Sequence, residues 1–230
     1  MLKKGLKGLL GQLDTRHWIE KDLDKVAEKS KRPVKAINYF YASWAGFCPK
    51  YIQENMNGLL PDTMTNQSRR IMDNGNYMHF RYAAYFKSIG KLIEEEPPFK
   101  KDFGDGVIIS GRGDLIVLDD KDEKFLIELK SINNRNFKEV FNAPKLEHLC
   151  QWNLCSNALG INKGAVFYEN KDDQTYRFHV LEYEESVYNK IFNDFKLIKE
   201  CNDKGLLVDR PEVCINPKYC PLKNICKKEK

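Results

Sequence analysis

The chain contains no long apolar run, no internal repeat and no low-complexity tract. Nowhere do about 18 uninterrupted apolar residues occur, so the sequence predicts no membrane-spanning helix. The N-terminal residues include leucines and lysines, but Gly5, Gly8 and Gly11 interrupt them and no small-residue cleavage site follows, so we expect no signal peptide. These absences predict a soluble, cytoplasmic protein.

The sequence also lacks a Gly-x-x-x-x-Gly-Lys-Ser/Thr loop, which excludes a P-loop ATPase. Of its 230 residues, 42% are hydrophobic and 31% charged, which excludes a disordered or fibrous chain and favours one well-filled core with appendages. Lys and Arg number 38 against 33 Asp and Glu, which gives a formal net charge of +5. This modest excess is compatible with a polyanionic partner but does not require one.

Apolar periodicity predicts helices and strands in alternation. Helical patterns, the first of which contains His79, occur at residues 67–92, 145–159 and 184–201. Runs rich in β-branched or large apolar residues predict strands at 107–110, 115–118, 125–129, 164–168 and 176–181. A break is expected at 94–98. This order is typical of an α/β fold with a mixed central sheet flanked by helices.

We expect the chain to have three parts. Residues 1–65 form a helical segment that contributes Cys48, residues 66–205 form the core, and residues 206–230 form a cysteine-rich tail. The tail is too polar to build a core of its own.

Two acids and a lysine occur on neighbouring predicted strands. Asp114 follows a Gly-Arg-Gly turn, and Glu128 and Lys130 lie in the next strand. Residues 119–124 are all charged, so the two strands are predicted to form an antiparallel hairpin. Because side chains alternate along a strand, Glu128 and Lys130 share a face. Closure of the loop between positions 119 and 125 would place Asp114 opposite Lys130 on that face.

This set of side chains suits phosphodiester hydrolysis. Hard divalent cations such as Mg²⁺ and Mn²⁺ prefer carboxylate oxygens, and a bound cation polarises a phosphate and lowers the pKa of an attacking water. Asp114 and Glu128 supply such oxygens, and Lys130 is suited to position the water or to stabilise charge on the phosphate. The same triplet is also compatible with ordinary solvated charges on a hairpin.

The chain resembles the PD-(D/E)xK nucleases, in particular their RecB-like group, which includes CRISPR-associated RecB-like nucleases and the nuclease domain of AddB. Gly111-x-x-Asp114 followed by Glu128-x-Lys130 looks like the second and third motifs of that family. Gly75-x-x-x-His79 is similar to its histidine metal ligand on the preceding helix. Gln151 matches the glutamine of the following helix, although the usual Gln-x-x-x-Tyr is here Gln151-x-x-x-Cys155.

The resemblance implies a restriction-endonuclease-like core with a metal site. Under it, the catalytic residues are Asp114, Glu128, Lys130 and Gln151, and His79 joins the two carboxylates in binding Mg²⁺ or Mn²⁺. The implied activity is that of a DNA exonuclease acting on single-stranded ends, in recombination, repair, replication or phage DNA processing in a bacterial, archaeal or phage-infected cell. Because the chain has no ATPase loop, a helicase or other recombination protein would be a separate partner.

Two alternatives stay open. One is a CRISPR-adaptation nuclease that trims DNA before integration, and the other is a non-catalytic, metal-clasped DNA-binding protein. The intact Asp114, Glu128 and Lys130 favour an enzyme. Taken singly, His79 in a helix rich in Tyr and Met is typical of a hydrogen-bonded, half-buried histidine, and Gln151 carries almost no information.

Seven cysteines, an odd number, are more typical of metal sites or core positions than of disulfides in a reducing compartment. Cys214, Cys220 and Cys226 follow one another at six-residue steps, and Cys48 is the obvious fourth thiolate. RecB-like nucleases with an iron–sulfur cluster have one cysteine before the core and three after it, so the resemblance implies a [4Fe–4S] cluster. Four thiolates also suit a structural Zn²⁺. The remaining cysteines are expected to be small core residues: Cys150, Cys155 and Cys201.

Single-stranded nucleic acid is held by basic grooves with aromatic platforms. Arg69, Arg70 and Arg81 lie near His79 in the sequence and are candidate phosphate contacts, although solvated surface charge explains them equally well. The aromatic residues upstream are better explained as core: Tyr39, Phe40, Tyr41 and Trp44.

Overall fold

The computed structural model describes residues 16–31, 33–209, 211, 220, 222 and 226. The chain divides into two compact units, Met1–Pro33 with Asp62–Asn74 and Val34–Pro61 with Gly75–Lys230. The part boundaries expected after residues 65 and 205 remain a prediction. Within the described ranges, none of the helices combines the length and the apolar character needed to cross a bilayer.

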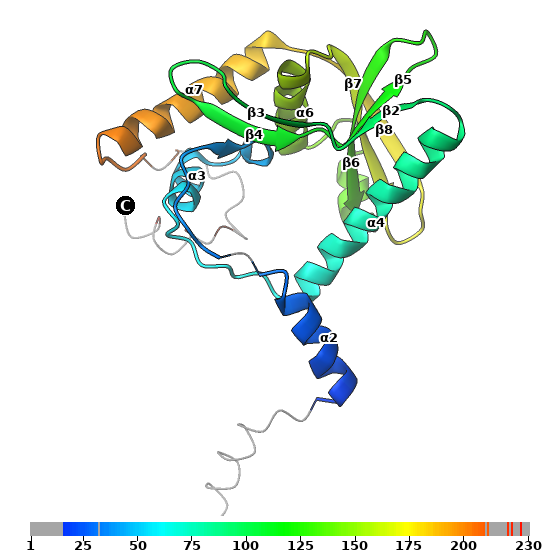
Figure 1. Ribbon diagram of the computed structural model, residues 1–230, viewed down its shortest axis with the longest axis horizontal. Coiled ribbons are helices and arrows are strands. Elements are labelled where there is room, and N and C mark those ends of the chain that lie inside the picture. Colours follow the sequence, from blue (N-terminus) through cyan, green and yellow to red (C-terminus); the bar gives the residue numbers. More distant parts are fainter. Residues whose placement is uncertain are drawn as a thin grey trace, which may run out of the picture. The chain divides into compact units, whose positions relative to one another are not determined.

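Helices and strands alternate along the chain (Figure 1). The helices are α2 (Trp18–Glu28), η1 (Ala42–Trp44, 3₁₀), α3 (Pro49–Met56), α4 (Asn66–Ser88), α5 (Asn134–Glu139), α6 (Leu146–Leu159) and α7 (Glu185–Asp203). The strands are β1 (Phe40–Tyr41), β2 (Leu92–Glu95), β3 (Pro98–Asp102), β4 (Ile108–Arg112), β5 (Leu115–Leu118), β6 (Lys124–Ile132), β7 (Lys163–Asn170) and β8 (Tyr176–Glu182).

The strands of the larger unit form two sheets. One has the order β1-β4-β3 and the other β2-β5-β6-β7-β8. In the second sheet β6 and β7 are parallel and the other neighbours are antiparallel. Figure 1 shows β3 and β4 lying apart from β5 to β8. The expected α/β fold with a mixed sheet is therefore confirmed.

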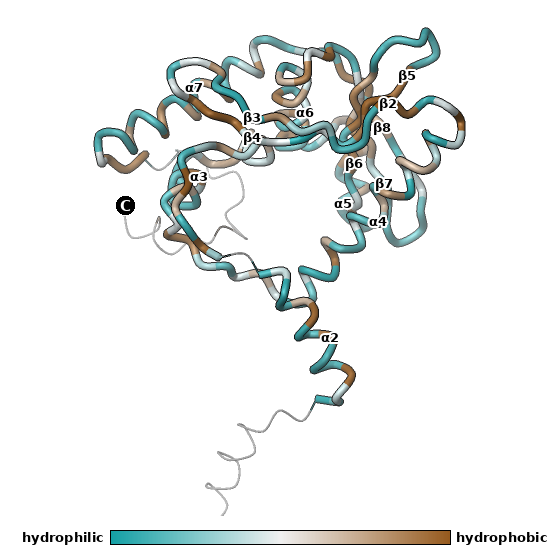
Figure 2. Tube along the Cα trace, viewed as in Figure 1, coloured by the Kyte–Doolittle hydropathy of each residue, from teal (hydrophilic) through white to brown (hydrophobic). Residues whose placement is uncertain are grey.

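Both faces of the five-stranded sheet are apolar. Leu126 and Tyr168 belong to a hydrophobic cluster that includes Trp152 of α6. Ile127 and Leu129, which point the other way because side chains alternate, belong to a cluster that includes Met78 of α4. Hydrophobic residues gather along β5 and β6 in Figure 2. The sheet therefore lies between α6 on one face and α4 on the other.

The predicted hairpin is present as β5 and β6, which are antiparallel. The sequence predicts that Asp114 lies opposite Lys130. In the structure Leu115 pairs with Ile127, so Asp114 lies opposite Glu128 instead. The predicted pairing register is wrong by two residues, because the last strand pair before the loop is Leu118 with Lys124. Since side chains alternate with a period of two, this shift leaves Asp114 on the face of Glu128 and Lys130.

The break expected at residues 94–98 is narrower in the structure and covers residues 96–97. Strand β2 ends at Glu95 and β3 begins at Pro98, which is tolerated as the first residue of an edge strand. The predicted strand at 107–110 is confirmed as β4, but it pairs with β1 and β3 and does not neighbour β5. The sequence does not predict strand β3, because its residues, PFKKD, are mostly charged. The strand lies at the edge of its sheet.

We expect Gly164→Ala to destabilise the protein by about 3 kcal/mol. A Cβ at position 164 would lie 1.9 Å from the Leu126 carbonyl oxygen and 2.7 Å from Trp152 Nε1, which itself donates to that oxygen. Strands β6 and β7 and helix α6 would be forced apart. Denaturant unfolding measures the loss.

Gly75→Ala is the control for this experiment. A Cβ there meets nothing within 4 Å inside α4, so helix propensity should stabilise the protein by about 1 kcal/mol. Equal unfolding midpoints for Gly164→Ala and the wild type would contradict this description of the contact between β6, β7 and α6.

Candidate active site

Asp114 is held at the start of the hairpin by the backbone of β6. Its side chain is buried, and its Oδ2 accepts a 2.6 Å hydrogen bond from the N–H of Leu129. A short carboxylate directly before β5 reaches the neighbouring strand, which fixes its position relative to Glu128.

Glu128 is fully buried and lies at the centre of a hydrogen-bonded triangle. Its Oε1 accepts from Lys130 Nζ at 2.7 Å and from Gln151 Nε2 at 2.6 Å. Lys130 Nζ also donates to Gln151 Oε1 at 3.1 Å. Glu128 and Lys130 come from one face of β6, and Gln151 comes from α6 above it, so the three side chains hold one another in place.

The second oxygen of Glu128 is different. Oε2 is buried and has no hydrogen-bond partner among the described residues. Leaving a buried carboxylate oxygen without a partner costs about 1–3 kcal/mol or more. The arrangement is therefore incomplete unless Oε2 meets a proton or a cation.

His79 reaches the same place from α4. Its Nδ1 lies 3.6 Å from Asp114 Oδ1, and its side chain is partly exposed. Burial lowers the pKa of His79 below its usual range, against the opposing effect of the Glu128 carboxylate. The ring is thus neutral near pH 7, the form in which histidine binds metals. The structure brings together the residues predicted for the catalytic site: His79, Asp114, Glu128, Lys130 and Gln151.

The two carboxyl groups are difficult to ionise together. Burial, and then the neighbouring Asp114, raises the pKa of Glu128 to about 7. Burial also raises the pKa of Asp114, although Lys130 opposes this. For Lys130, burial lowers the pKa, but the Glu128 and Asp114 carboxylates outweigh it and raise the pKa above its usual range. The site therefore places one protonated ammonium group beside two carboxyl groups whose pKa values are raised.

This chemistry fits a divalent cation. Among the described residues, no three His, Cys, Asp or Glu side chains are arranged as a ready metal-binding group. Mg²⁺, however, usually takes only one or two protein carboxylates and fills its other positions with water and substrate phosphate. Asp114 and the unpartnered Oε2 of Glu128 match that need.

Cys155, where the resemblance to the PD-(D/E)xK nucleases leads one to expect a tyrosine, lies in the core. It is fully buried, and its Sγ lies 3.7 Å from the Arg112 carbonyl oxygen. Burial raises the pKa of its thiol well above the usual range. The expected core roles of the remaining cysteines are confirmed, since Cys150 and Cys155 are buried in the cluster against α6 and Cys201 packs on it.

The structure describes three of the four predicted cysteine ligands. Cys214 lies outside the described residues, whereas Cys48, Cys220 and Cys226 are partly exposed. Within the described part of the chain these thiols do not form a metal-binding group. Cys48 lies directly before α3.

The predicted phosphate-binding arginines already have partners. Arg81 pairs with the buried Glu169 and donates to Gln174 Oε1 at 3.1 Å. In the smaller unit Arg69 is buried against Asp62, and Arg70 pairs with Asp24 at 2.7 Å. Their assignment to nucleic acid remains a prediction.

Sequence reasoning missed two residues beside the site. Tyr168 of β7 pairs in register with Lys130, and its hydroxyl lies 2.8 Å from His148 Nδ1. His148 lies one helical turn before Gln151 on α6, on the same side of the helix. This three-residue spacing was the available signal.

The sequence matches no protein-family model and no curated protein. Solved structures do share its fold. SSO0001 superposes with a TM-score of 0.56 at 18% identity, over 92% of this chain and 99% of its own. An alkaline exonuclease, LHK-Exo from Laribacter hongkongensis, gives a TM-score of 0.50 at 15% identity over 80% of this chain and 95% of its own. Its complex with dAMP gives a TM-score of 0.50 at 15% identity over 73% and 91%.

In EDTA, we expect the wild type to lose about 3 kcal/mol of stability relative to Glu128→Gln as the pH rises from about 4.5 to 7. The folded pKa of Glu128, about 7, lies above its ordinary value of 4.5, so in this window the folded state holds a proton that the unfolded state has released. The stabilisation that protonated Glu128 contributes is therefore complete below this pH window and is lost as the pH rises across the window.

Denaturant unfolding at several pH values measures the difference between the two proteins. Burial lowers the pKa of His148, so this group acts in the opposite direction in both proteins, and the comparison removes its contribution because Glu128 is not among the causes of its shift. A difference that does not vary with pH would contradict the assigned environment of Glu128.

Proposed function

We propose that the protein is a PD-(D/E)xK nuclease that hydrolyses phosphodiester bonds in DNA with Mg²⁺ or Mn²⁺. The observation that carries this proposal is the buried Asp114 and Glu128 beside a charged Lys130, with one Glu128 oxygen unpartnered. The sequence motifs and the fold shared with SSO0001 and LHK-Exo support it.

Asp114, Glu128 and His79 would hold the cation. When bound, it would polarise the phosphate and stabilise negative charge on it. Glu128 offers Oε2 for this purpose, because Oε1 is occupied by Lys130 and Gln151. With a pKa of about 7, Glu128 ionises readily near neutral pH once a positive charge replaces its proton.

Lys130 supplies a fixed positive charge. An ammonium group has three donors, of which Glu128 and Gln151 take two. The third is left for a phosphate oxygen or for the attacking water. Because Gln151 both donates to Glu128 and accepts from Lys130, it orients the ammonium group, and a pre-positioned charge stabilises the transition state without reorganisation.

We infer that the substrate is a DNA end, preferably single-stranded. Support comes from the family resemblance and from the shared fold with LHK-Exo, which is named an alkaline exonuclease and was also crystallised with dAMP. Unwinding of duplex DNA would fall to a separate ATP-driven partner.

The test is degradation of end-labelled single-stranded and duplex DNA with Mg²⁺ or Mn²⁺. We expect Lys130→Ala to slow cleavage by about 100-fold or more, because a pre-positioned charge is removed from the transition state. Lys124→Ala is the matched control, since Lys124 is exposed at the start of the same strand. DNA binding in EDTA, measured by fluorescence anisotropy, reports whether the variant still binds.

Two outcomes would contradict the proposal. If wild type and Lys130→Ala are equally inert but bind DNA, the protein is a binding protein without catalysis. If both cleave equally well, catalysis does not depend on Lys130 and the site is assigned wrongly.

We further propose that Cys48, Cys214, Cys220 and Cys226 bind a structural [4Fe–4S] cluster. Support comes from Gln53 of α3, which is buried and donates to the Leu206 carbonyl oxygen at 2.8 Å. Gln53 also donates to Asn202 Oδ1 at 2.9 Å and accepts from the N–H of Val208 at 2.7 Å. These bonds keep the segment that leads toward Cys214 next to α3, which begins just after Cys48.

Anaerobically purified protein should be brown, with the broad visible absorbance of thiolate-bound iron. Cys48→Ser should lose the colour and part of the stability, because the metal would link α3 to the tail. Cys201→Ser, a partly buried cysteine outside the set, should keep both. A colourless wild type with stoichiometric zinc would refute the cluster and leave a zinc clasp.

A further inference from the structure

A row of side chains leads from Lys130 to the edge of the sheet. Lys130 of β6 pairs in register with Tyr168 of β7, and Tyr168 pairs with Arg177 of β8. Register partners point to the same face, so all three lie on the face that α6 covers. With neighbouring strands about 4.8 Å apart, Arg177 lies about 10 Å from Lys130.

Tyr168 fixes the orientation of His148. The Tyr168 hydroxyl oxygen accepts the N–H of Lys145 at 3.0 Å and lies 2.8 Å from His148 Nδ1. Among the described residues, Nδ1 is the one acceptor within hydrogen-bond distance of this buried hydroxyl, so we assign the hydroxyl hydrogen to Nδ1 and the ring hydrogen of the neutral His148 to Nε2. Among the described residues, Nε2 has no hydrogen-bond partner.

His148 stays neutral near the site. Burial, followed by the positive charges of Lys130 and Lys145, lowers its pKa to about 3. Its Nε2–H is therefore a neutral donor on the same side of α6 as Gln151, whose side chain contacts Lys130.

Arg177 fixes an exposed aromatic ring at the end of the row. Its guanidinium lies 4.7 Å from the ring centroid of the buried Phe137 and 4.3 Å from that of Phe141. Its Nη1 also donates to the Phe137 carbonyl oxygen at 3.2 Å. Phe141 is 66% exposed, so the cation supports one side of the ring and leaves much of it open to solvent.

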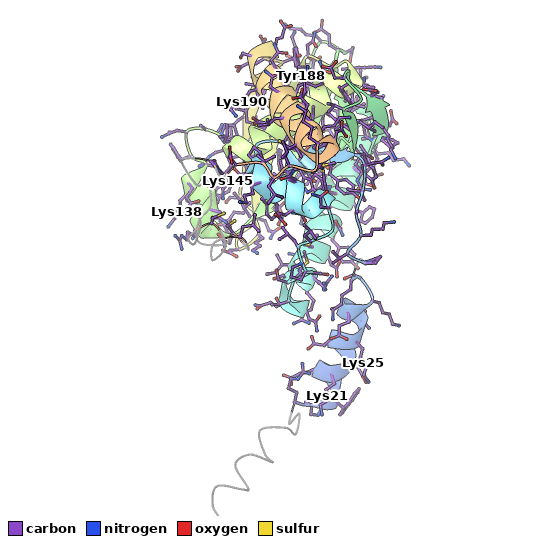
Figure 3. All side chains as sticks on the ribbon, turned by 90° about the vertical axis from the view of Figure 1, so that its left-hand side faces the viewer. Lys21, Lys25, Lys138, Lys145, Tyr188 and Lys190 are labelled. Atoms are coloured by element: carbon purple, nitrogen blue, oxygen red, sulfur yellow. The ribbon has the colours of Figure 1, made fainter. Side chains whose placement is uncertain are left out.

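Lysines flank this ring in the sequence, at positions 138 and 145. Lys138 and Lys145 lie on the same flank of the larger unit (Figure 3). Glu139 lies 3.7 Å from Lys145 and offsets part of that charge. An open aromatic face beside cations and a neutral N–H donor is complementary to an unpaired nucleotide, which offers a base for stacking and a phosphate for hydrogen bonding.

We propose that Phe141 and His148 bind an unpaired nucleotide adjacent to the one at Lys130, with its base stacked on Phe141 and its phosphate accepting from His148 Nε2. The inference rests on the proposed nuclease function and deepens it. A base inside a duplex is stacked on both faces by its neighbours, so this surface selects single strands.

The test is binding of a fluorescein-labelled oligothymidylate in EDTA, followed by anisotropy. We expect Phe141→Ala to weaken binding by about tenfold, the effect of losing one stacked base, and to leave binding of a duplex unchanged. Phe178→Ala is the matched control, because Phe178 is 56% exposed on the opposite face of β8 from Arg177. It should change binding by less than about twofold.

His148 has its own readout. His148→Leu removes the donor and should weaken single-strand binding by about fivefold, whereas His148→Gln keeps an N–H donor and should recover most of it. Because the ring is neutral, neither variant should change the slope of log affinity against log salt concentration. A changed slope would mean that the variants disturb the charged surroundings, and would overturn the assigned role of His148.

Failure of this inference can be distinguished from failure of the proposed function. If the wild type cleaves and binds single strands while Phe141→Ala binds them as well as Phe178→Ala does, the surface is wrong and the nuclease stands. If Phe141→Ala weakens single-strand and duplex binding equally, base stacking is refuted. If the wild type neither binds nor cleaves DNA, the proposed function fails and this surface fails with it.

Discussion

The structure depends on keeping Asp114 and Glu128 buried at the same level of the β5–β6 hairpin. Burial raises the pKa of both carboxyl groups, and the neighbouring Asp114 raises the pKa of Glu128 further. Lys130 offsets one negative charge only, and Glu128 Oε2 has no partner within the described residues. Such a site is poorly stabilised by the protein itself, which is the condition under which an added cation gains most from binding.

The fold positions the groups around this acid pair. Strand β6 places Glu128 and Lys130 on one face, and close packing of α6 on that face, permitted by Gly164, brings Gln151 to both. Helix α4 covers the other face and brings His79 to Asp114 from there. Tyr168 and Arg177 continue the same register on β7 and β8. The pairing of these strands therefore positions both Lys130 and the surface beside it.

The sequence predicted the hairpin, the faces of its side chains and the convergence of His79 and Gln151, because local alternation and family spacing carry that information. It missed the register by two residues, because loop closure depends on turn geometry that composition does not encode. The short strand β3 was missed because tertiary pairing, not apolar pattern, makes it a strand. Phe141 gave no signal, and the spacing of His148 and Gln151 did not by itself reveal a role, since both roles depend on Arg177 and Tyr168, which are distant in sequence.

The most direct measurement is the number of protons released when Mn²⁺ binds at pH 7, obtained by titration calorimetry in buffers of different ionisation enthalpy. Because the pKa of Glu128 is about 7, binding to the wild type should release about half a proton or more, and Glu128→Gln should lose that release together with most of the affinity. Binding of Mn²⁺ with equal proton release in both proteins, or no binding to the wild type, would contradict a cation site at the buried acid pair.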